Sequence, residues 1–203
     1  MNSSASPDGP DDLHTLWRRL ETWLRTHAPG DFSALRPGAS VTEIATLEAG
    51  IGFPPDPALA SLLSMHNGVE RRRSSGSPGA FLLGYSLLPV DRIIESHAHL
   101  VSLANDAVED GYEEEVIGRI AHPRWVPFAQ ALTGDLLFID HRTDGFGAIG
   151  EMSFGDPDYA KLWPSLPVML RDLCSAVEGP TPVSLARRFP SLHENRMVEW
   201  VTD

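Results

Sequence analysis

Three short apolar runs lie near the middle of the chain, at residues 125–129, 136–139 and 146–152, separated by stretches rich in glycine and aspartate. Glycine tolerates a positive φ and aspartate caps turns with its own side chain, so such stretches reverse the chain. Apolar runs of four to six residues between turns are typical of antiparallel strands. The pattern predicts a β-meander over residues 125–152 as the centre of the fold.

Helices are predicted on both sides of this meander, because apolar residues recur there at spacings of three and four. The first helix begins at Asp11 or Asp12 and ends at Pro29, and its apolar stripe includes Trp17 and Trp23. Two tryptophans on such a stripe indicate core packing rather than a ligand platform, because the apolar face is what docks a helix.

Capping residues locate the other helices. Ser40 and Glu43 form a capping box for the second helix. A third helix begins at Asp56, which is followed by proline, and ends at residues 67–68, where glycine is expected as the left-handed cap. Asp91 is expected to cap a fourth helix, and Ser165 a fifth that ends at residues 179–180.

These elements predict an α+β fold, in which a central antiparallel sheet of about four or more strands is flanked by helices. One further strand is expected at residues 81–83. At 203 residues the chain suits one domain with a substantial core. We expect a disordered arm at residues 1–10, a single domain over 11–179, and an extension over 180–203 that packs on the domain.

The net charge of the chain limits the kinds of molecule that it is expected to bind. The chain has 28 acidic and 16 basic residues, and its formal net charge is −12. A field of this sign repels nucleic acid and anionic membranes and attracts basic proteins. With no apolar run of membrane-spanning length and a single cysteine, Cys174, a cytoplasmic location is the expectation.

No motif for catalysis, cofactor binding or metal binding stands out, so neither a cofactor nor a metal is expected. Residues 145–150 match G-x-G-x-x-G, but the residues that follow do not begin a helix, so we interpret these glycines as hairpin geometry. Cys174 is expected to be buried and inert. His97 and His99 lie two positions apart, on different faces of a helix, and do not form a ligand pair.

An acidic cluster is the candidate contact for a partner. It consists of Glu109, Asp110, Glu113, Glu114 and Glu115. The cluster lacks the spacing and the turn glycine of a calcium loop. It fits either an ordinary solvated face or a patch for a basic partner. The arginines at residues 71–73 are similarly interpreted as a solvated loop rather than a phosphate site.

The order of these features resembles the SUKH superfamily, the group named after the fungal Smi/Knr cell-wall-assembly regulators. The residues that carry the likeness are 35–40, 44, 47–48, 53–56, 62–68, 87–90, 93–94, 125–129, 134–135, 138–140, 147 and 150. The resemblance implies an α+β domain without catalytic residues. It also implies a binding role, since bacterial members resemble immunity proteins that neutralise toxins, many of them nucleases or deaminases.

The sequence is therefore compatible with two functions. The favoured one is a non-enzymatic protein-binding domain, an immunity protein that neutralises a basic toxin such as a nuclease by direct binding. The alternative is a small-molecule-binding regulator or an enzyme with a site near His122, Asp140 and His141. A pocket that holds those three side chains together would favour the alternative.

Overall fold

The computed structural model describes residues 10–70, 74, 76–112, 121–154, 160–179, 183, 188–194 and 196–202. The elements in chain order are α1 (Pro10–His27), α2 (Pro29–Ala34), α3 (Val41–Ile51), α4 (Pro57–Met65), β1 (Ser86–Leu87), α5 (Val90–Glu109), β2 (Trp125–Gln130), β3 (Leu136–Asp140), the 3-10 turn η1 (Thr143–Gly145), β4 (Ile149–Met152), β5 (Ala160–Trp163), α7 (Leu166–Glu178), β6 (Arg188–His193) and β7 (Met197–Thr202).

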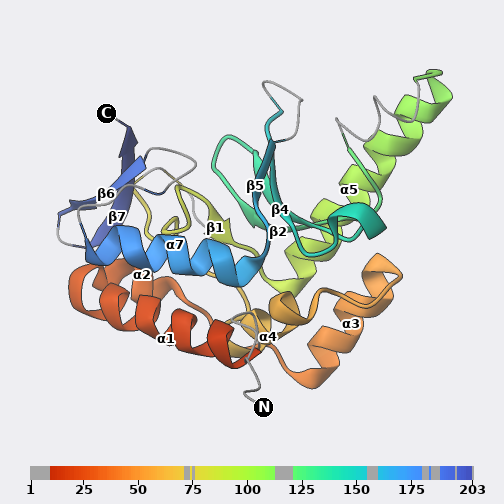
Figure 1. Ribbon diagram of the computed structural model, residues 1–203. Helices are drawn as coiled ribbons and strands as arrows, with labels where there is room; N and C mark the ends of the chain where they lie inside the picture. Colours follow the sequence, from red (N-terminus) through yellow and green to blue (C-terminus); the bar gives the residue numbers. More distant parts are fainter. Residues whose placement is uncertain are drawn as a thin grey trace, which may run out of the picture.

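The predicted meander forms the centre of a five-stranded antiparallel sheet with the strand order β1-β2-β3-β4-β5 (Figure 1). Its strands β2, β3 and β4 fall where the apolar runs predicted them, and the predicted α+β fold is confirmed. The sequence did not predict β5, which completes one edge. The glycines of residues 145–150 lead into strand β4, which confirms their interpretation as hairpin geometry.

Side chains that alternate along the strands supply two separate cores. On β3, Leu137 and Ile139 join the larger core, which also contains residues of α1, α4 and α7. Leu136 and Phe138 point to the opposite face and join a smaller core with Leu100 of α5. This period of two is the geometry of a strand covered on both faces. The sheet therefore lies between α5 on one face and α1, α4 and α7 on the other.

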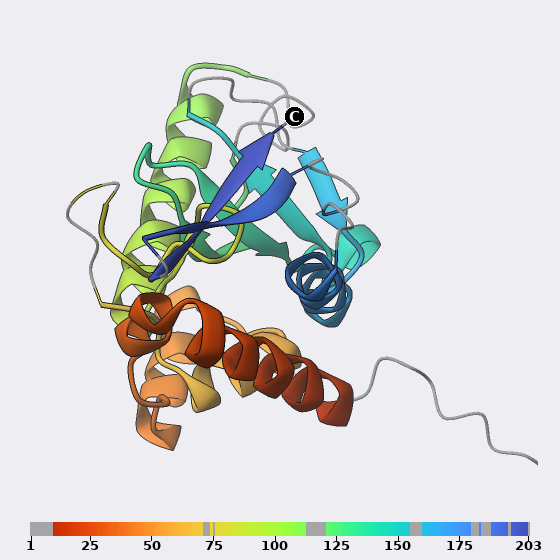
Figure 2. The same ribbon diagram turned by 90° about the vertical axis from the view of Figure 1, so that its left-hand side faces the viewer.

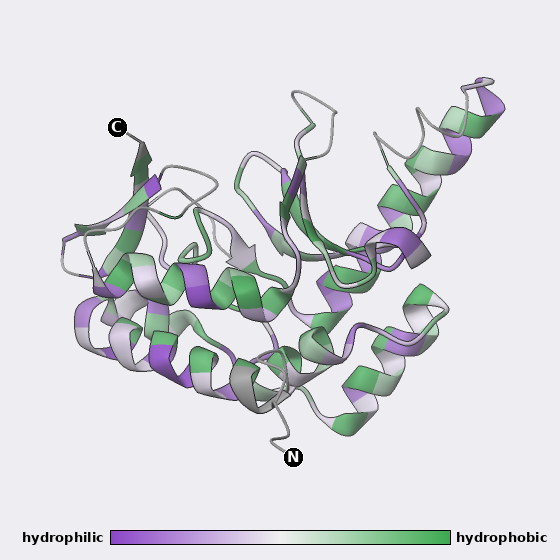
Figure 3. Cartoon of the chain, viewed as in Figure 1, coloured by the Kyte–Doolittle hydropathy of each residue, from purple (hydrophilic) through white to green (hydrophobic). Residues whose placement is uncertain are grey.

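The helices form layers around this sheet. Helix α1 packs along α7 and against α4, and α3 packs beside α5. Figure 2 shows α1 and α7 on the same side of the sheet, with α5 running along the other side. In Figure 3 the strands of the central sheet are mostly hydrophobic, whereas hydrophilic residues recur along the helices. This pattern agrees with amphipathic helices that enclose an apolar sheet.

Three of the predicted helix starts are confirmed by their hydrogen bonds. Ser40 and Glu43 form the reciprocal capping box at the start of α3. Asp56 caps α4 by accepting from two backbone amides, and Ser165 caps α7. These side chains accept hydrogen bonds from the first amides of each helix, which have no partner within the helix. Because the capping residue is adjacent to the helix in sequence, the sequence pattern could predict these helix starts.

Three other sequence predictions are wrong. Residues 81–83 form turns, with Leu83 at a positive φ of 58°, and strand β1 begins at Ser86 instead. Helix α4 ends at Met65, because His66 is already extended. Asp91 does not cap α5; it lies in the first turn, and the amide of Val90 donates to a side chain from elsewhere in the chain.

The last part of the chain contains a β-hairpin that the sequence analysis did not predict. Strands β6 and β7 pair with each other and contact α7 and α2. Trp200 donates its indole N–H to the carbonyl of Phe81 at 2.9 Å, and Arg188 donates to the carbonyl of Leu83 at 2.7 Å. These bonds hold the hairpin against residues 81–83, which the sequence pattern predicted to be a strand.

Candidate functional site

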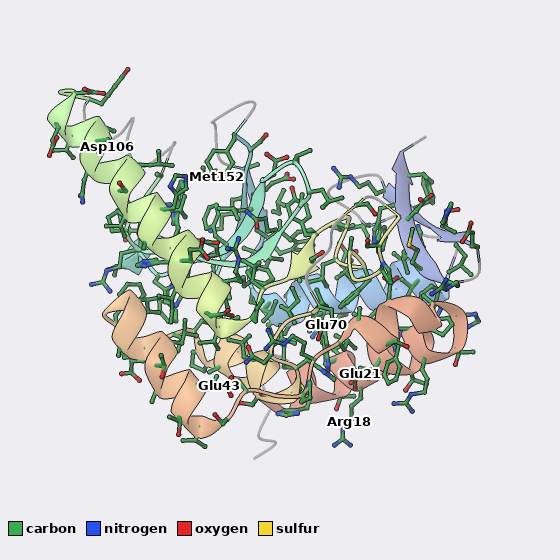
Figure 4. The ribbon with its side chains drawn as sticks, turned by 180° about the vertical axis from the view of Figure 1, so that it is seen from behind. Arg18, Glu21, Glu43, Glu70, Asp106 and Met152 are labelled. Atoms are coloured by element: carbon green, nitrogen blue, oxygen red, sulfur yellow. The ribbon has the colours of Figure 1, made fainter. Side chains whose placement is uncertain are left out.

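The outer end of α5 carries the described part of the predicted acidic cluster. Glu109 and Asp110 are exposed, and Asp106 is exposed one turn before them. Figures 1 and 4 show this end of the helix extending beyond the rest of the molecule. The other predicted members, Glu113, Glu114 and Glu115, lie outside the described residues. We call residues 105–112 the α5 tip.

The charges at the α5 tip destabilise this end of the helix when no partner is bound. Asp106 is spaced by three and four residues from Glu109 and Asp110, so the three carboxylates share one face and repel each other. They also lie at the carboxyl end of the helix, where the macrodipole favours positive charge, and the last turn contains no basic residue. A cationic partner would relieve both interactions.

Exposed apolar side chains accompany these charges. Val108 is 60% exposed and Tyr112 is 55% exposed. A tyrosine beside carboxylates combines apolar contact area with polar groups, as protein interfaces commonly do. The α5 tip therefore has the composition of a contact surface.

His122, Asp140 and His141 lie near one end of strands β2 and β3. The amide of His141 donates to the carbonyl of Arg124 at 2.8 Å, and Trp125 pairs with Asp140. The three residues therefore come from adjoining segments. None of them lines the cavities described below.

The imidazole of His141 is fully engaged in the fold. Its Nε2 accepts from the amide of Asp56 at 2.9 Å, so its Nδ1 carries the proton and donates to the carbonyl of Ile139 at 3.1 Å. Burial lowers the pKa of His141 below its ordinary value. The ring links the sheet to the start of α4 and leaves no nitrogen for proton transfer.

Asp140 and His122 also have local partners. The carboxylate of Asp140 pairs with the guanidinium of Arg142 at 2.7 Å and accepts the amide of the same residue at 2.9 Å. Nδ1 of His122 accepts from the amide of Arg124 at 2.9 Å. Both arrangements are turn interactions between residues two positions apart.

Other candidate groups are likewise structural. Cys174 is buried, its thiol contacts the carbonyl of Leu16 at 3.4 Å, and burial raises its pKa to about 11. His97 donates to the carbonyl of Pro123, whereas His99 is exposed. Within the described parts of the chain, no cluster of histidine, cysteine and carboxylates suits a metal ion. The arginines at residues 71–73 lie outside the described residues.

Two of the cavities bear on a candidate site. One of about 620 Å³ lies between β1, the β2–β3 turn and the start of α5, and both Arg36 and Asp91 line it. The second, of about 320 Å³, lies where α4 and α7 begin, and Asp56 lines it together with Phe146. The sequence pattern predicts Asp56 only as a helix cap, because its place in a cavity depends on segments far away in the sequence.

No helix among the described residues is both long enough and apolar enough to cross a membrane. Comparison with known proteins identifies relatives of the domain. The chain is 25% identical over 167 residues to the cell wall biosynthesis/cell cycle regulator smi1 of Schizosaccharomyces pombe, a match that covers 72% of this chain and 32% of that protein. It is 28% identical over 99 residues to KNR4/SMI1 homolog 2 of Debaryomyces hansenii, which covers 48% and 16% respectively.

The chain thus spans about a third or less of the length of these two curated relatives. The model of the SMI1 / KNR4 family (SUKH-1) matches residues 38–172, from the start of α3 into α7, which includes the whole central sheet. This match covers most of the chain and agrees with the expected resemblance. The chain belongs to the SMI1 / KNR4 (SUKH-1) family.

Proposed function

We propose that this chain is a non-enzymatic protein-binding domain whose α5 tip contacts a basic partner. The observation that carries the proposal is the set of like charges at the carboxyl end of α5. Asp106, Glu109 and Asp110 have no ion-pair partner among the described residues. Their arrangement costs the isolated helix free energy that a cationic surface would recover.

The net charge of the chain supports the same proposal. At −12, it creates a field that speeds association with a basic protein and slows association with nucleic acid. A nuclease must present a positive surface to its phosphodiester substrate, so acidic side chains can occupy that surface in place of phosphate. We therefore infer an immunity role, in which the domain neutralises a basic toxin by direct binding.

The names of the two relatives also support a role without catalysis of its own. Both relatives carry Smi1/Knr4 names, and one is named as a regulator of cell wall biosynthesis and the cell cycle. Binding to another protein is one way in which a regulator acts, and it is the way in which an immunity protein neutralises a toxin. A catalytic role near His122, Asp140 and His141 is less favoured, because each of these side chains is occupied in a structural hydrogen bond.

The test is affinity capture from the host's lysate at low and moderate salt, with the wild-type chain and a charge-reversed variant. Asp106→Lys combined with Asp110→Lys reverses the α5 tip. Glu48→Lys combined with Glu70→Lys is the matched control, since these exposed carboxylates lie outside the tip. We expect one basic protein to be captured by the wild type and the control, with less captured at higher salt.

Binding of the purified partner to each variant then measures the contact directly. Equal affinity of the tip variant and the wild type would contradict the proposed surface. Growth measurements test the immunity role. Expression of a toxic partner should stop growth, and co-expression of this chain should restore it. A captured protein that is acidic, or that has no toxic effect, would contradict the immunity role.

A further inference from the structure

The cavity of about 320 Å³ at the starts of α4 and α7 has a mostly apolar wall that contains one carboxylate and the side chain of Ser165. Pro57, Pro164 and Pro167 contribute to this wall, together with Leu13 of α1. The pyrrolidine rings fix the backbone at three positions, so the cavity is formed before any ligand arrives. Its volume suits a single side chain or a small molecule.

The carboxylate belongs to Asp56, which is 8% exposed. Its Oδ1 accepts from the amides of Ala58 and Leu59 at 2.9 and 3.2 Å, as a helix cap does. Its Oδ2 accepts no hydrogen bond from any described residue and lies beside Gly147, which lines the same cavity. Oδ2 therefore keeps its acceptor capacity and faces a mostly apolar cavity, where a charged donor would form a stronger hydrogen bond than in open water.

The helix starts around this cavity do not favour an anion. Pro57 and Pro167 lack an N–H group, and Asp56 and Ser165 already accept amides of the first turns of α4 and α7. The partial positive charge of these helix ends is therefore mostly satisfied. What remains is one negative oxygen within an apolar wall.

Phe146 completes the site at its rim. Its side chain is 58% exposed, although its ring contacts the imidazole of His141 edge-on at 5.5 Å between centroids. An exposed aromatic face next to a buried carboxylate is an arrangement that attracts an organic cation. The two groups come from different segments that both line the cavity, the start of α4 and the turn between β3 and β4.

We propose that this cavity binds an alkylammonium group, with the ammonium donating to Oδ2 of Asp56 and the aliphatic chain lying against the prolines and Phe146. The ligand is either a free aliphatic amine or the side chain of a lysine, since both carry the same chemistry. The site is separate from the α5 tip, so the proposal holds whether or not the tip binds a basic protein.

The test is a titration of the ¹⁵N-labelled full chain with n-butylammonium chloride, read from the amide signals of Gly147 and Ala58. 1-Butanol and sodium chloride serve as ligand controls. 1-Butanol tests whether the apolar chain alone causes the shifts, and sodium chloride tests the effect of ionic strength. We expect saturable shifts with the amine alone. A parallel titration with Nα-acetyl-lysine methylamide distinguishes the two sources, because a site for a lysine side chain binds it and a site for free amines does not.

The decisive variant is Asp56→Asn, which retains an oxygen to cap α4 while replacing Oδ2 with an uncharged group. We expect the affinity for n-butylammonium to fall by about tenfold or more. Asp91→Asn, an equal change of charge outside this cavity, should leave the affinity unchanged. Ala58→Met fills the cavity without altering the carboxylate and should also abolish binding.

Shifts that do not saturate, or an Asp56→Asn variant that binds as the wild type does, would overturn the proposal. So would saturable shifts confined to amides away from the cavity. The variant with the charge-reversed α5 tip distinguishes this proposal from the proposed function. It should no longer bind the protein partner but should still bind the amine. Loss of amine binding in that variant would place the ammonium elsewhere and contradict the assignment to Asp56.

Discussion

The buried carboxylate of Asp31 accepts a hydrogen bond from the amide of Val198 at 2.6 Å and so joins α2 to strand β7. The same carboxylate accepts from the amide of Gly79, also at 2.6 Å. One side chain near the start of the chain thus holds both the C-terminal hairpin and the segment before β1. Asp31 has no exposed surface, which makes these bonds strong determinants of the local structure.

Replacing Asp31 with alanine should destabilise the protein by about 2–4 kcal/mol, because two buried amides lose a charged acceptor. Equilibrium unfolding in urea measures the change in free energy. Hydrogen exchange at Val198 should accelerate more than exchange in the central sheet, since the hairpin loses its anchor first. Asp31→Asn is the control, because it retains one acceptor oxygen and should cost less. Equal exchange throughout the chain in the alanine variant would contradict this anchoring role.

Asn67 connects three helices through one amide group. Its Oδ1 accepts from the amide of Val90 at 2.8 Å, and its Nδ2 donates to Glu43 at 2.8 Å. Asn67→Ala should therefore lower the free energy of unfolding by about 1–2 kcal/mol, the usual cost of a lost helix cap. Asn67→Asp should keep the cap of α5 and lose the bond to Glu43, so its effect on the α5 amides should be smaller. Equal exchange rates at Val90 in the two variants would argue against the cap.

The case of Asn67 shows what the sequence pattern could not predict. The dipeptide at residues 67–68 suggested a helix end, and Asp91 suggested a local cap for α5. In the structure the cap is Asn67, 23 positions earlier in the chain. Local rules identify caps that bond within a few residues, as Ser40, Asp56 and Ser165 do, and they miss caps supplied by tertiary contact.

Strands and short helices were likewise predictable only where the local sequence pattern is strong. Strands β2, β3 and β4 are strongly apolar, so their pattern was sufficient, whereas β5 and β6 are half-exposed and give a weak signal. Helix α2 has only six residues and includes Gly30, and a helix of that length depends on its neighbours. Of the candidate sites, the charges of the α5 tip were visible in the sequence. The cavity at Asp56 was not, because four separate segments form it.

Acid should weaken the fold through His97 and His141. Burial lowers the pKa of both imidazoles below the ordinary value of 6.5. The unfolded chain therefore binds protons at these positions before the folded chain does. The contribution of the two imidazoles to stability is thus constant above about pH 6.5 and falls as the pH drops toward the lower folded pKa values. Urea unfolding at several pH values measures this slope.

Variants separate the contribution of each imidazole. His141→Gln should flatten the slope below pH 6.5, because an amide does not titrate, although it should also lower stability at neutral pH by losing the bond to Asp56. His99→Gln is the control, since that ring is exposed and should leave the slope unchanged. A slope that persists in the combined His97→Gln and His141→Gln variant would assign the acid sensitivity to other groups.

Phe138 lies over Gly150 on the neighbouring strand, and this contact requires glycine. The two residues pair across β3 and β4, and a Cβ built on Gly150 would approach Cζ of Phe138 to 2.3 Å. Phe138 also stacks on Trp125, with 4.2 Å between ring centroids, so it has little freedom to move. Gly150→Ala should therefore destabilise the sheet by about 1–3 kcal/mol through overpacking, which thermal or urea unfolding would detect.

A double-mutant cycle tests this steric explanation against a general loss of backbone freedom. Phe138→Leu removes the ring and should itself destabilise the core. If the clash is the cause, Gly150→Ala should cost much less in the Phe138→Leu background than in the wild type, which gives a favourable coupling energy. Additive effects would instead indicate that the backbone of β4, rather than the aromatic ring, excludes a side chain at this position.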